Sequence, residues 1–328
     1  MTDGRKRSTA LAALLIAVGS LGLHAATPAA AEPNIDTVKQ RVERLYAQAE
    51  KASERYNAAK EQLKASQVRL KALNADLSRQ RRVVDDMRGE VATMVVEQYQ
   101  GESLSTASQV VFSSDAQSFL DNLNAISSYN SQRGQVVREY GVQLKRLKLR
   151  KSAADDQVAA LTKTRTVLKD EKARIDDRAA KAKALLSKLK EKQRLALMSH
   201  PTVSAAPAVP SAGGRAGAAV RYAMAQVGDA YVWGATGPSA YDCSGLTMMA
   251  WAQGGVGLPH SSSAQQGSGR RVAESDLQPG DLVFYYSPVH HVGMYIGNGM
   301  IVHAANPSAG VTVASLHSMP YMGATRPG

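Results

Sequence analysis

Cysteine and aromatic residues are scarce in this sequence. Of its 328 residues one is cysteine, two are tryptophan and three are phenylalanine, and aromatic residues make up 5% of the chain. A single cysteine excludes an intrachain disulfide framework and a cysteine-rich zinc site. The shortage of aromatic side chains argues against one large globule, and a chain of this length typically forms about two domains.

Long apolar runs are equally rare. The clearest covers residues 9–23; it follows the basic residues Arg5, Lys6 and Arg7 and precedes a run of alanines at residues 29–31. This order is typical of a secretory signal peptide, and about 15 apolar residues fall short of the ~20 that span a bilayer. We therefore predict a signal peptide over residues 1–31 and a mature protein that is secreted and acts at the cell wall or cell surface.

Charge and glycine divide the rest of the sequence into two parts. Residues 32–199 contain 32 Lys and Arg, 22 Asp and Glu, and four Gly, whereas residues 217–328 contain 17 Gly, both Trp and the cysteine. The basic excess therefore lies in the first part. Its mixed charges predict a solvated helical exterior, and no basic motif interleaved with aromatic residues supports a nucleic-acid partner.

A heptad repeat runs through the first part. Two tracks of positions, beginning at Ile35 and Val38, continue for nine heptads, and sixteen of their eighteen residues are apolar. A less regular track runs from Tyr140 to Leu189. Sustained heptads predict a coiled coil, about 100 Å long at 1.5 Å per residue. Because both stretches are of similar length and share one connector, we predict an antiparallel helical hairpin over residues 32–199. Parallel pairing of two chains is the alternative.

Beyond the hairpin, residues 200–216 are rich in Pro, Ala and Gly and show no apolar periodicity, which predicts a flexible linker. Residues 217–328 suffice for one small α+β domain. Helices are expected before Gly228 and over 243–253. Strands are expected over residues 281–287, 291–296, 300–304 and 310–314. The first helix should bury one apolar face, formed by Val220, Ala223, Met224 and Val227.

The chemistry of this domain is expected at Cys243. It stands where a loop enters a helix, and the positive end of a helix dipole favours the thiolate; a buried, inert cysteine is the alternative. His291 and His303 fall on neighbouring strands, where one imidazole could act as base and the other could orient it. His290 should point to the opposite face of its strand. A three-histidine metal site would need His290 and His291 to converge, which strand alternation opposes.

Four short motifs mark the domain at residues 217–328. They are YVWG at 231–234, YDCSGL at 241–246, LQPGDLVF at 277–284 and HVGMYIG at 291–297. In order and spacing they resemble the NlpC family of papain-like cell-wall peptidases. One departure is Ala235, which follows Gly234 where many relatives have a second glycine. The resemblance implies a papain-like α+β catalytic domain, here preceded by a long α-helical coiled-coil hairpin.

The resemblance implies an endopeptidase that cleaves peptidoglycan stem peptides, commonly at the D-γ-glutamyl–diaminopimelate bond. Cys243 matches the nucleophile of the family, His291 its base, and His303 the third, orienting position. Tyr231 matches a tyrosine close to the thiol, where it could contact the oxyanion or the substrate. We expect neither a metal nor another cofactor to be required.

Two further residues flank the nucleophile in the family motif. Asp242 and Ser244 are candidate contacts for the stem peptide. Two other functions remain alternatives: an amidase or acyltransferase that uses the same thiol, and a non-catalytic coiled-coil protein whose terminal domain binds the cell wall.

The hairpin resembles the arms of secreted Gram-positive and actinobacterial hydrolases. In some of these proteins the arm is bound by the FtsE–FtsX membrane complex, so a similar complex is a candidate partner. We expect the arm, through a head at residues 101–130, to restrain the active site until that partner engages. A spacer that only positions the enzyme is the alternative.

Overall fold

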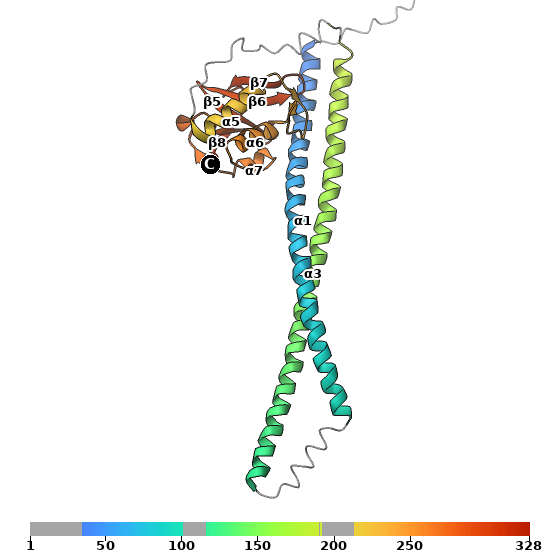
Figure 1. Ribbon diagram of the computed structural model, residues 1–328. Coiled ribbons are helices and arrows are strands. Elements are labelled where there is room, and N and C mark those ends of the chain that lie inside the picture. The colour runs from blue at the N-terminus through green and yellow to red at the C-terminus, as the bar shows by residue number, and fades with distance from the viewer. Residues whose placement is uncertain (1–34, 101–115, 190, 192–212) are drawn as a thin grey trace, which may run out of the picture. The chain divides into compact units, whose positions relative to one another are not determined.

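The structure is a computed structural model that describes residues 35–100, 116–189, 191 and 213–328 (Figure 1). The expected signal peptide lies outside these residues, as do residues 101–115 of the expected head and residues 200–212 of the expected linker. Among the described residues, no helix is long and apolar enough to cross a membrane.

The first part of the chain is a helical hairpin. Helix α1 (Ile35–Tyr99) and helix α3 (Ala116–Leu186) run side by side in opposite directions (Figure 1). Near one end Val38 packs with Leu189, and further along Gln80 hydrogen-bonds Gln143. As residue numbers increase along α1, the numbers of the contacting residues decrease on the returning segment. This is the pattern of an antiparallel pair. The predicted hairpin is confirmed.

The heptad positions form the seam between the two helices. A polar pair interrupts this seam: Gln80, which is 7% exposed, donates to the side-chain oxygen of Gln143 at 2.8 Å. Its amide is thereby satisfied within the contact between the two helices. The apolar seam residues that are buried are Val38, Val42, Ala49, Ala52, Ala59, Leu77 and Val84 on α1, and Ala154, Leu161, Ile175, Ala182 and Leu189 on the returning segment.

Helix α1 also buries polar residues outside the two heptad tracks. Ser53, Glu54 and Asn57 are 3%, 8% and 2% exposed. A charged side chain is rarely buried unless it is paired. Glu54 and Asn57 form hydrogen bonds with residues of the C-terminal domain, so this stretch of α1 has a second contact surface in addition to α3.

The C-terminal part is an α+β domain. Its helices are α5 (Gly214–Ala225), α6 (Cys243–Gln253) and the short α7 (Ser262–Gln265). Six antiparallel strands form one sheet in the order β3-β8-β4-β5-β6-β7, and β1 pairs in parallel with β2. The strand bounds are β1 Ala230–Tyr231, β2 Ala240–Tyr241, β3 Arg270–Val272, β4 Leu282–Tyr285, β5 His291–Gly297, β6 Met300–Asn306, β7 Gly310–Ser315 and β8 Tyr321–Arg326.

The core of this domain lies between α6 and the sheet. Leu246, Ala250 and Trp251 of α6 are 0–2% exposed and pack in one cluster with β4, β5 and β6. The predicted helix at 243–253 and the four predicted strands are confirmed, with small shifts at their ends. The prediction that Val227 is buried was wrong: its side chain is 44% exposed, because α5 ends at Ala225 and the chain turns before Val227.

A partly buried ion pair links the last strand to the residue before β4. The Arg326 guanidinium on β8 binds the carboxylate of Asp281 in a two-pronged contact at 2.6 and 2.7 Å. The second carboxylate oxygen also accepts the backbone N–H of Gln278. Strand β8 pairs with β4 in the sheet, and the ion pair reinforces this pairing. The sequence pattern predicts neither β8 nor β3.

Candidate active site

Cys243 is the first residue of α6 and is 4% exposed. The residue before it caps the helix: one oxygen of the Asp242 carboxylate accepts the backbone N–H of Gly245 at 2.7 Å. The same oxygen contacts Nε2 of His260 at 2.8 Å, and the other accepts the backbone N–H of Gly234 at 2.9 Å. Asp242 thus fixes both the start of the helix and the loop beside it.

Gly245 is required by the close approach of that loop. A Cβ atom at this position would lie 2.2 Å from the backbone oxygen of Ala235. The same Ala235 oxygen accepts the backbone N–H of Asp242 at 2.9 Å. The small residue two positions after the cysteine therefore lets the preceding loop pack against the helix and hold the thiol in place.

The two histidines meet across neighbouring strands. His291 begins β5 and His303 lies on β6, which pairs with β5 in antiparallel fashion. Nε2 of His291 and Nδ1 of His303 are 2.8 Å apart. One ring nitrogen of His291 and the Cys243 sulfur lie within 4.8 Å of each other. Burial, and then the neighbouring His291, lowers the pKa of His303, which favours its neutral form.

The other residues named from the sequence lie close to the thiol. Tyr231 is 5% exposed, its ring packs edge-on against Trp233, and burial raises its pKa. Ser244 is fully buried and its hydroxyl donates to Asp242 at 3.3 Å. In this conformation Asp242 and Ser244 therefore bond to protein groups.

His290 lies apart from this group. Its ring stacks on Tyr286 with centroids 4.5 Å apart, and Nδ1 contacts the backbone oxygen of Pro288 at 2.7 Å. Among the described residues, the metal-ligating side chains that converge are instead Glu50, Cys243 and His291.

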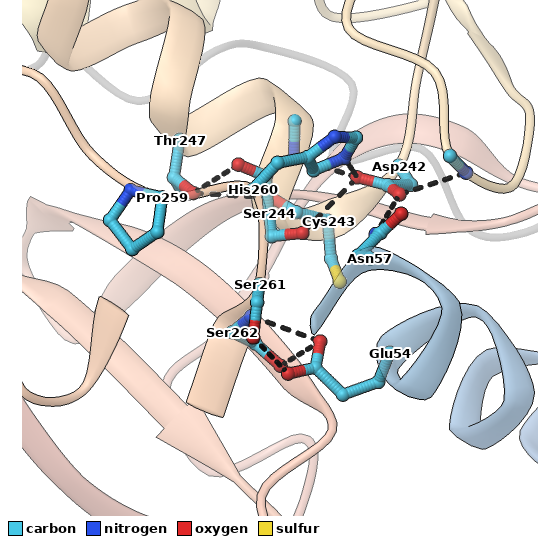
Figure 2. A network of polar contacts seen from close by, with 12 residues as sticks. Glu54, Asn57, Asp242, Cys243, Ser244, Thr247, Pro259, His260, Ser261 and Ser262 are labelled. Carbon is cyan, nitrogen blue, oxygen red and sulfur yellow. Dashed lines mark hydrogen bonds and ion pairs between the residues drawn. The ribbon is translucent and has the colours of Figure 1, made fainter. Parts of the chain in front are cut away.

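Residues of α1 complete the site, and the sequence analysis did not find them. The carboxylate of Glu50 contacts Nδ1 of His291. Asn57 donates from its amide at 2.8 Å to the Asp242 oxygen that also accepts the backbone N–H of Gly234. In Figure 2 the Cys243 sulfur lies between the side chains of Asn57 and Glu54.

Glu54 makes the most extensive of these contacts. Its carboxylate accepts five hydrogen bonds from three consecutive serines, Ser261, Ser262 and Ser263. Two of the donors are backbone N–H groups and three are hydroxyls, at distances of 2.6–2.9 Å (Figure 2). The contacts compensate for the burial of the carboxylate.

The surroundings of the thiol differ from the expectation of a thiolate at a helix N-terminus. Burial raises the pKa of Cys243 well above its ordinary value, and the carboxylates of Glu50, Asp242 and Glu54 raise it further. A hydrogen bond from the backbone of Val292 lowers the pKa by less. In this conformation the surroundings of Cys243 therefore favour the protonated thiol.

A sequence signal for the α1 contacts does exist, although it is weak. Tyr46, Glu50, Ser53 and Asn57 are spaced three or four residues apart, which places them on one face of a helix. Polar residues at that spacing normally form a solvated exterior. The spacing alone could not show that another domain covers them.

An open cavity of about 890 Å³ reaches the histidines from the side. Among its lining residues are Tyr46 and Glu50 of α1 and His291, His303 and Asn306 of the sheet. The two imidazoles therefore border this cavity, although His291 and His303 are only 1% and 5% exposed while α1 contacts the domain.

The C-terminal part of the chain is similar to known proteins. Residues 228–325 match the NlpC/P60 family. The chain carries an NlpC/P60 domain. A probable endopeptidase of Corynebacterium glutamicum is 45% identical over 131 residues, which cover 40% of this chain and 61% of that protein. A probable endopeptidase of Mycobacterium tuberculosis is 48% identical over 107 residues, covering 33% and 28%.

Among solved structures, the NlpC/P60 domain of the peptidoglycan hydrolase SagA is 33% identical, with a TM-score of 0.32; the match covers 34% of this chain and 97% of that one. The curated relatives named above are matched over only 61% and 28% of their own lengths. The family match covers residues 228–325, a range that contains the four motifs named in the sequence analysis.

Proposed function

We propose that this protein is a secreted cysteine endopeptidase of peptidoglycan that cleaves stem peptides at the D-γ-glutamyl–diaminopimelate bond. The observation that carries the proposal is the meeting of Cys243, His291 and His303 at the start of α6. The NlpC/P60 domain and the relatives named as endopeptidases and peptidoglycan hydrolases support it. Such hydrolases act outside the cell or in its wall.

The geometry suits acyl transfer through a thiol. Nδ1 of His291 takes the thiol proton, and the Cys243 sulfur attacks the carbonyl carbon of the stem peptide. The imidazolium then gives that proton to the departing amine, which leaves an acyl-enzyme. Water, deprotonated by His291, hydrolyses the thioester and regenerates the thiol. His303 orients the ring through the 2.8 Å contact with Nε2.

Substrate contacts are assigned to the residues around the thiol. Tyr231 is proposed to contact the oxyanion or the stem peptide, because its buried ring lies beside Cys243. Asp242 and Ser244 are proposed to bind the stem peptide once Asn57 has withdrawn from the Asp242 carboxylate. This assignment requires a conformation in which α1 leaves the site.

The hairpin is proposed to regulate the enzyme by closing this site. Glu50 occupies the imidazole nitrogen that would accept the thiol proton, and Glu54 and Asn57 lie on either side of the sulfur. Among the described residues this contact comes from residues 46–57 of α1. Residues 101–115 of the expected head lie outside the described residues, so a restraining role for the head stays a prediction. A partner that engages the hairpin, such as an FtsE–FtsX-like membrane complex, would release the contact.

The test is digestion of purified muropeptides with product masses as the readout. The full chain carrying Glu54→Ala and Asn57→Ala, which opens the site, should produce cleaved stem peptides, and adding Cys243→Ala should abolish cleavage. Products cut at the sugar–peptide amide or acyl transfer products would instead support the amidase or acyltransferase. Binding of the opened chain to cell wall without any product would support the non-catalytic alternative.

A further inference from the structure

Three side chains that can act as metal ligands lie close together where α1 meets the active site. The Glu50 carboxylate, the Cys243 thiol and Nδ1 of His291 converge so closely that their ligand atoms all lie within 4.8 Å of one another. One of the three comes from the hairpin and two from the NlpC/P60 domain. We propose that the closed conformation binds one divalent transition-metal ion of the zinc type through these three side chains.

The ligand set selects the class of metal. Thiolate sulfur, imidazole nitrogen and carboxylate oxygen are the three donor types that bind zinc in proteins. Magnesium and calcium prefer oxygen donors throughout, which this group does not offer. Three protein ligands also leave one position of a tetrahedral ion for water.

The surroundings support a cation at this point. The Glu50 carboxylate contacts His291, and the Asp242 carboxylate belongs to the residue that caps α6 directly before Cys243. The Cys243 and His291 side chains are almost fully buried, and Glu50 is 14% exposed. Mutual repulsion among negative groups at low dielectric is costly. A bound divalent ion would compensate this charge.

The second ring nitrogen of His291 is held as in a metal site. Histidines that bind a metal through one nitrogen usually hydrogen-bond a fixed partner through the other, which sets the tautomer and the orientation of the ring. Here Nε2 of His291 is 2.8 Å from Nδ1 of His303, so Nδ1 of His291 is directed at Glu50 and Cys243.

An access route is also present. The cavity of about 890 Å³ is lined by both Glu50 and His291 and reaches solvent. An ion could therefore enter without separation of the hairpin from the domain.

Binding would replace a proton by the ion. The thiol releases its proton to solvent, and the sulfur lone pair forms the bond to the metal, with no change in oxidation state. Because the ion takes both the nucleophile and the base, it would hold the enzyme inactive and link α1 to the domain. This inhibitory role rests on the proposed function, whereas the binding itself does not.

The experiment is a titration of the metal-free full chain with Co²⁺, followed by the thiolate-to-cobalt charge-transfer absorption, and with Zn²⁺ by calorimetry. We expect one equivalent of each ion. Glu50→Gln should weaken binding by about ten-fold or more, which corresponds to about 1.4 kcal/mol. Cys243→Ser should abolish the charge-transfer band.

The matched control is Glu61→Gln. It makes the same change of charge on α1, eleven residues beyond Glu50 or about 16 Å along the helix, and should leave the affinity unchanged. Absence of a cobalt–thiolate band in the wild type, or equal affinities for the wild type and Glu50→Gln, would overturn the proposal. Neither readout involves hydrolysis, so such a result would leave the muropeptide assay to judge the peptidase assignment separately.

Discussion

The Glu54 carboxylate on α1 binds both the backbone N–H and the hydroxyl of Ser262, at 2.9 and 2.8 Å, across 208 residues of sequence. The bond joins the hairpin to the NlpC/P60 domain at a point adjoining the thiol. Because both partners are buried, the strength of this contact affects how readily the site opens.

Replacing Glu54 by Ala should raise the rate of muropeptide hydrolysis. The change removes five hydrogen bonds to the three serines. A loss of about 2 kcal/mol from the closed form would increase the open population about thirty-fold. Initial rates on a soluble muropeptide measure the effect, with Glu61→Ala as the control on the same helix. A rate no higher than that of the control would contradict a closing role for Glu54.

Replacing Ser53 by Ala should have the opposite effect. Within the described part of the chain, the Ser53 hydroxyl is buried without a hydrogen-bond partner. Removing an unsatisfied buried hydroxyl should stabilise the closed contact by about 1 kcal/mol and lower the hydrolysis rate about five-fold. The same assay checks this, and an increased rate would show that the hydroxyl has a partner in the closed form.

Gly245→Ala should disable the site. Its Cβ would lie 2.2 Å from the Ala235 oxygen, so the loop before the nucleophile would have to move. We expect a loss of activity of at least about a hundred-fold, since small misplacements of reacting groups have effects of that size. Gly257→Ala, where no atom lies within 4 Å of the new Cβ, is the control. Near-normal activity of an opened chain that carries Gly245→Ala would refute the argument.

Arg326→Ala should destabilise the NlpC/P60 domain. It leaves the Asp281 carboxylate, 1% exposed, without its ion-pair partner. Breaking a buried pair in this way costs about 3 kcal/mol; the partial exposure of the Arg326 side chain, 24%, places the effect at the low end of the range. Urea denaturation should show a lower midpoint than for Arg221→Ala, an exposed site on α5. Equal midpoints would mean that water solvates the Asp281 carboxylate in place of the guanidinium without lowering the free energy of unfolding.

Local patterns in the sequence were sufficient to predict much of the domain. An Asp-Cys-Ser-Gly segment predicts a capped helix start at Cys243, and the structure places the helix there. His291 and His303 flank a tight turn at Gly297–Gly299, so pairing of their strands brings the rings together. These features depend on residues close in sequence or on one hairpin.

The contacts of α1 could not be predicted in this way. Glu50, Glu54 and Asn57 are outside the two heptad tracks, and a charged helix face has the same composition whether it meets water or another domain. Strand β8 was missed for a related reason. Its alternation is weak, and its place beside β4 depends on the distant partner Asp281.

The polar pair in the seam of the hairpin has a mechanical consequence. The buried Gln80 amide donates to the half-buried Gln143, and sliding one helix by a heptad would remove this acceptor and leave the Gln80 amide buried without it. The two helices are thereby pinned in one register. Because the helices cannot slide relative to each other, a displacement of one end of the hairpin would move the whole hairpin. It would therefore also move the surface of α1 that contacts the active site.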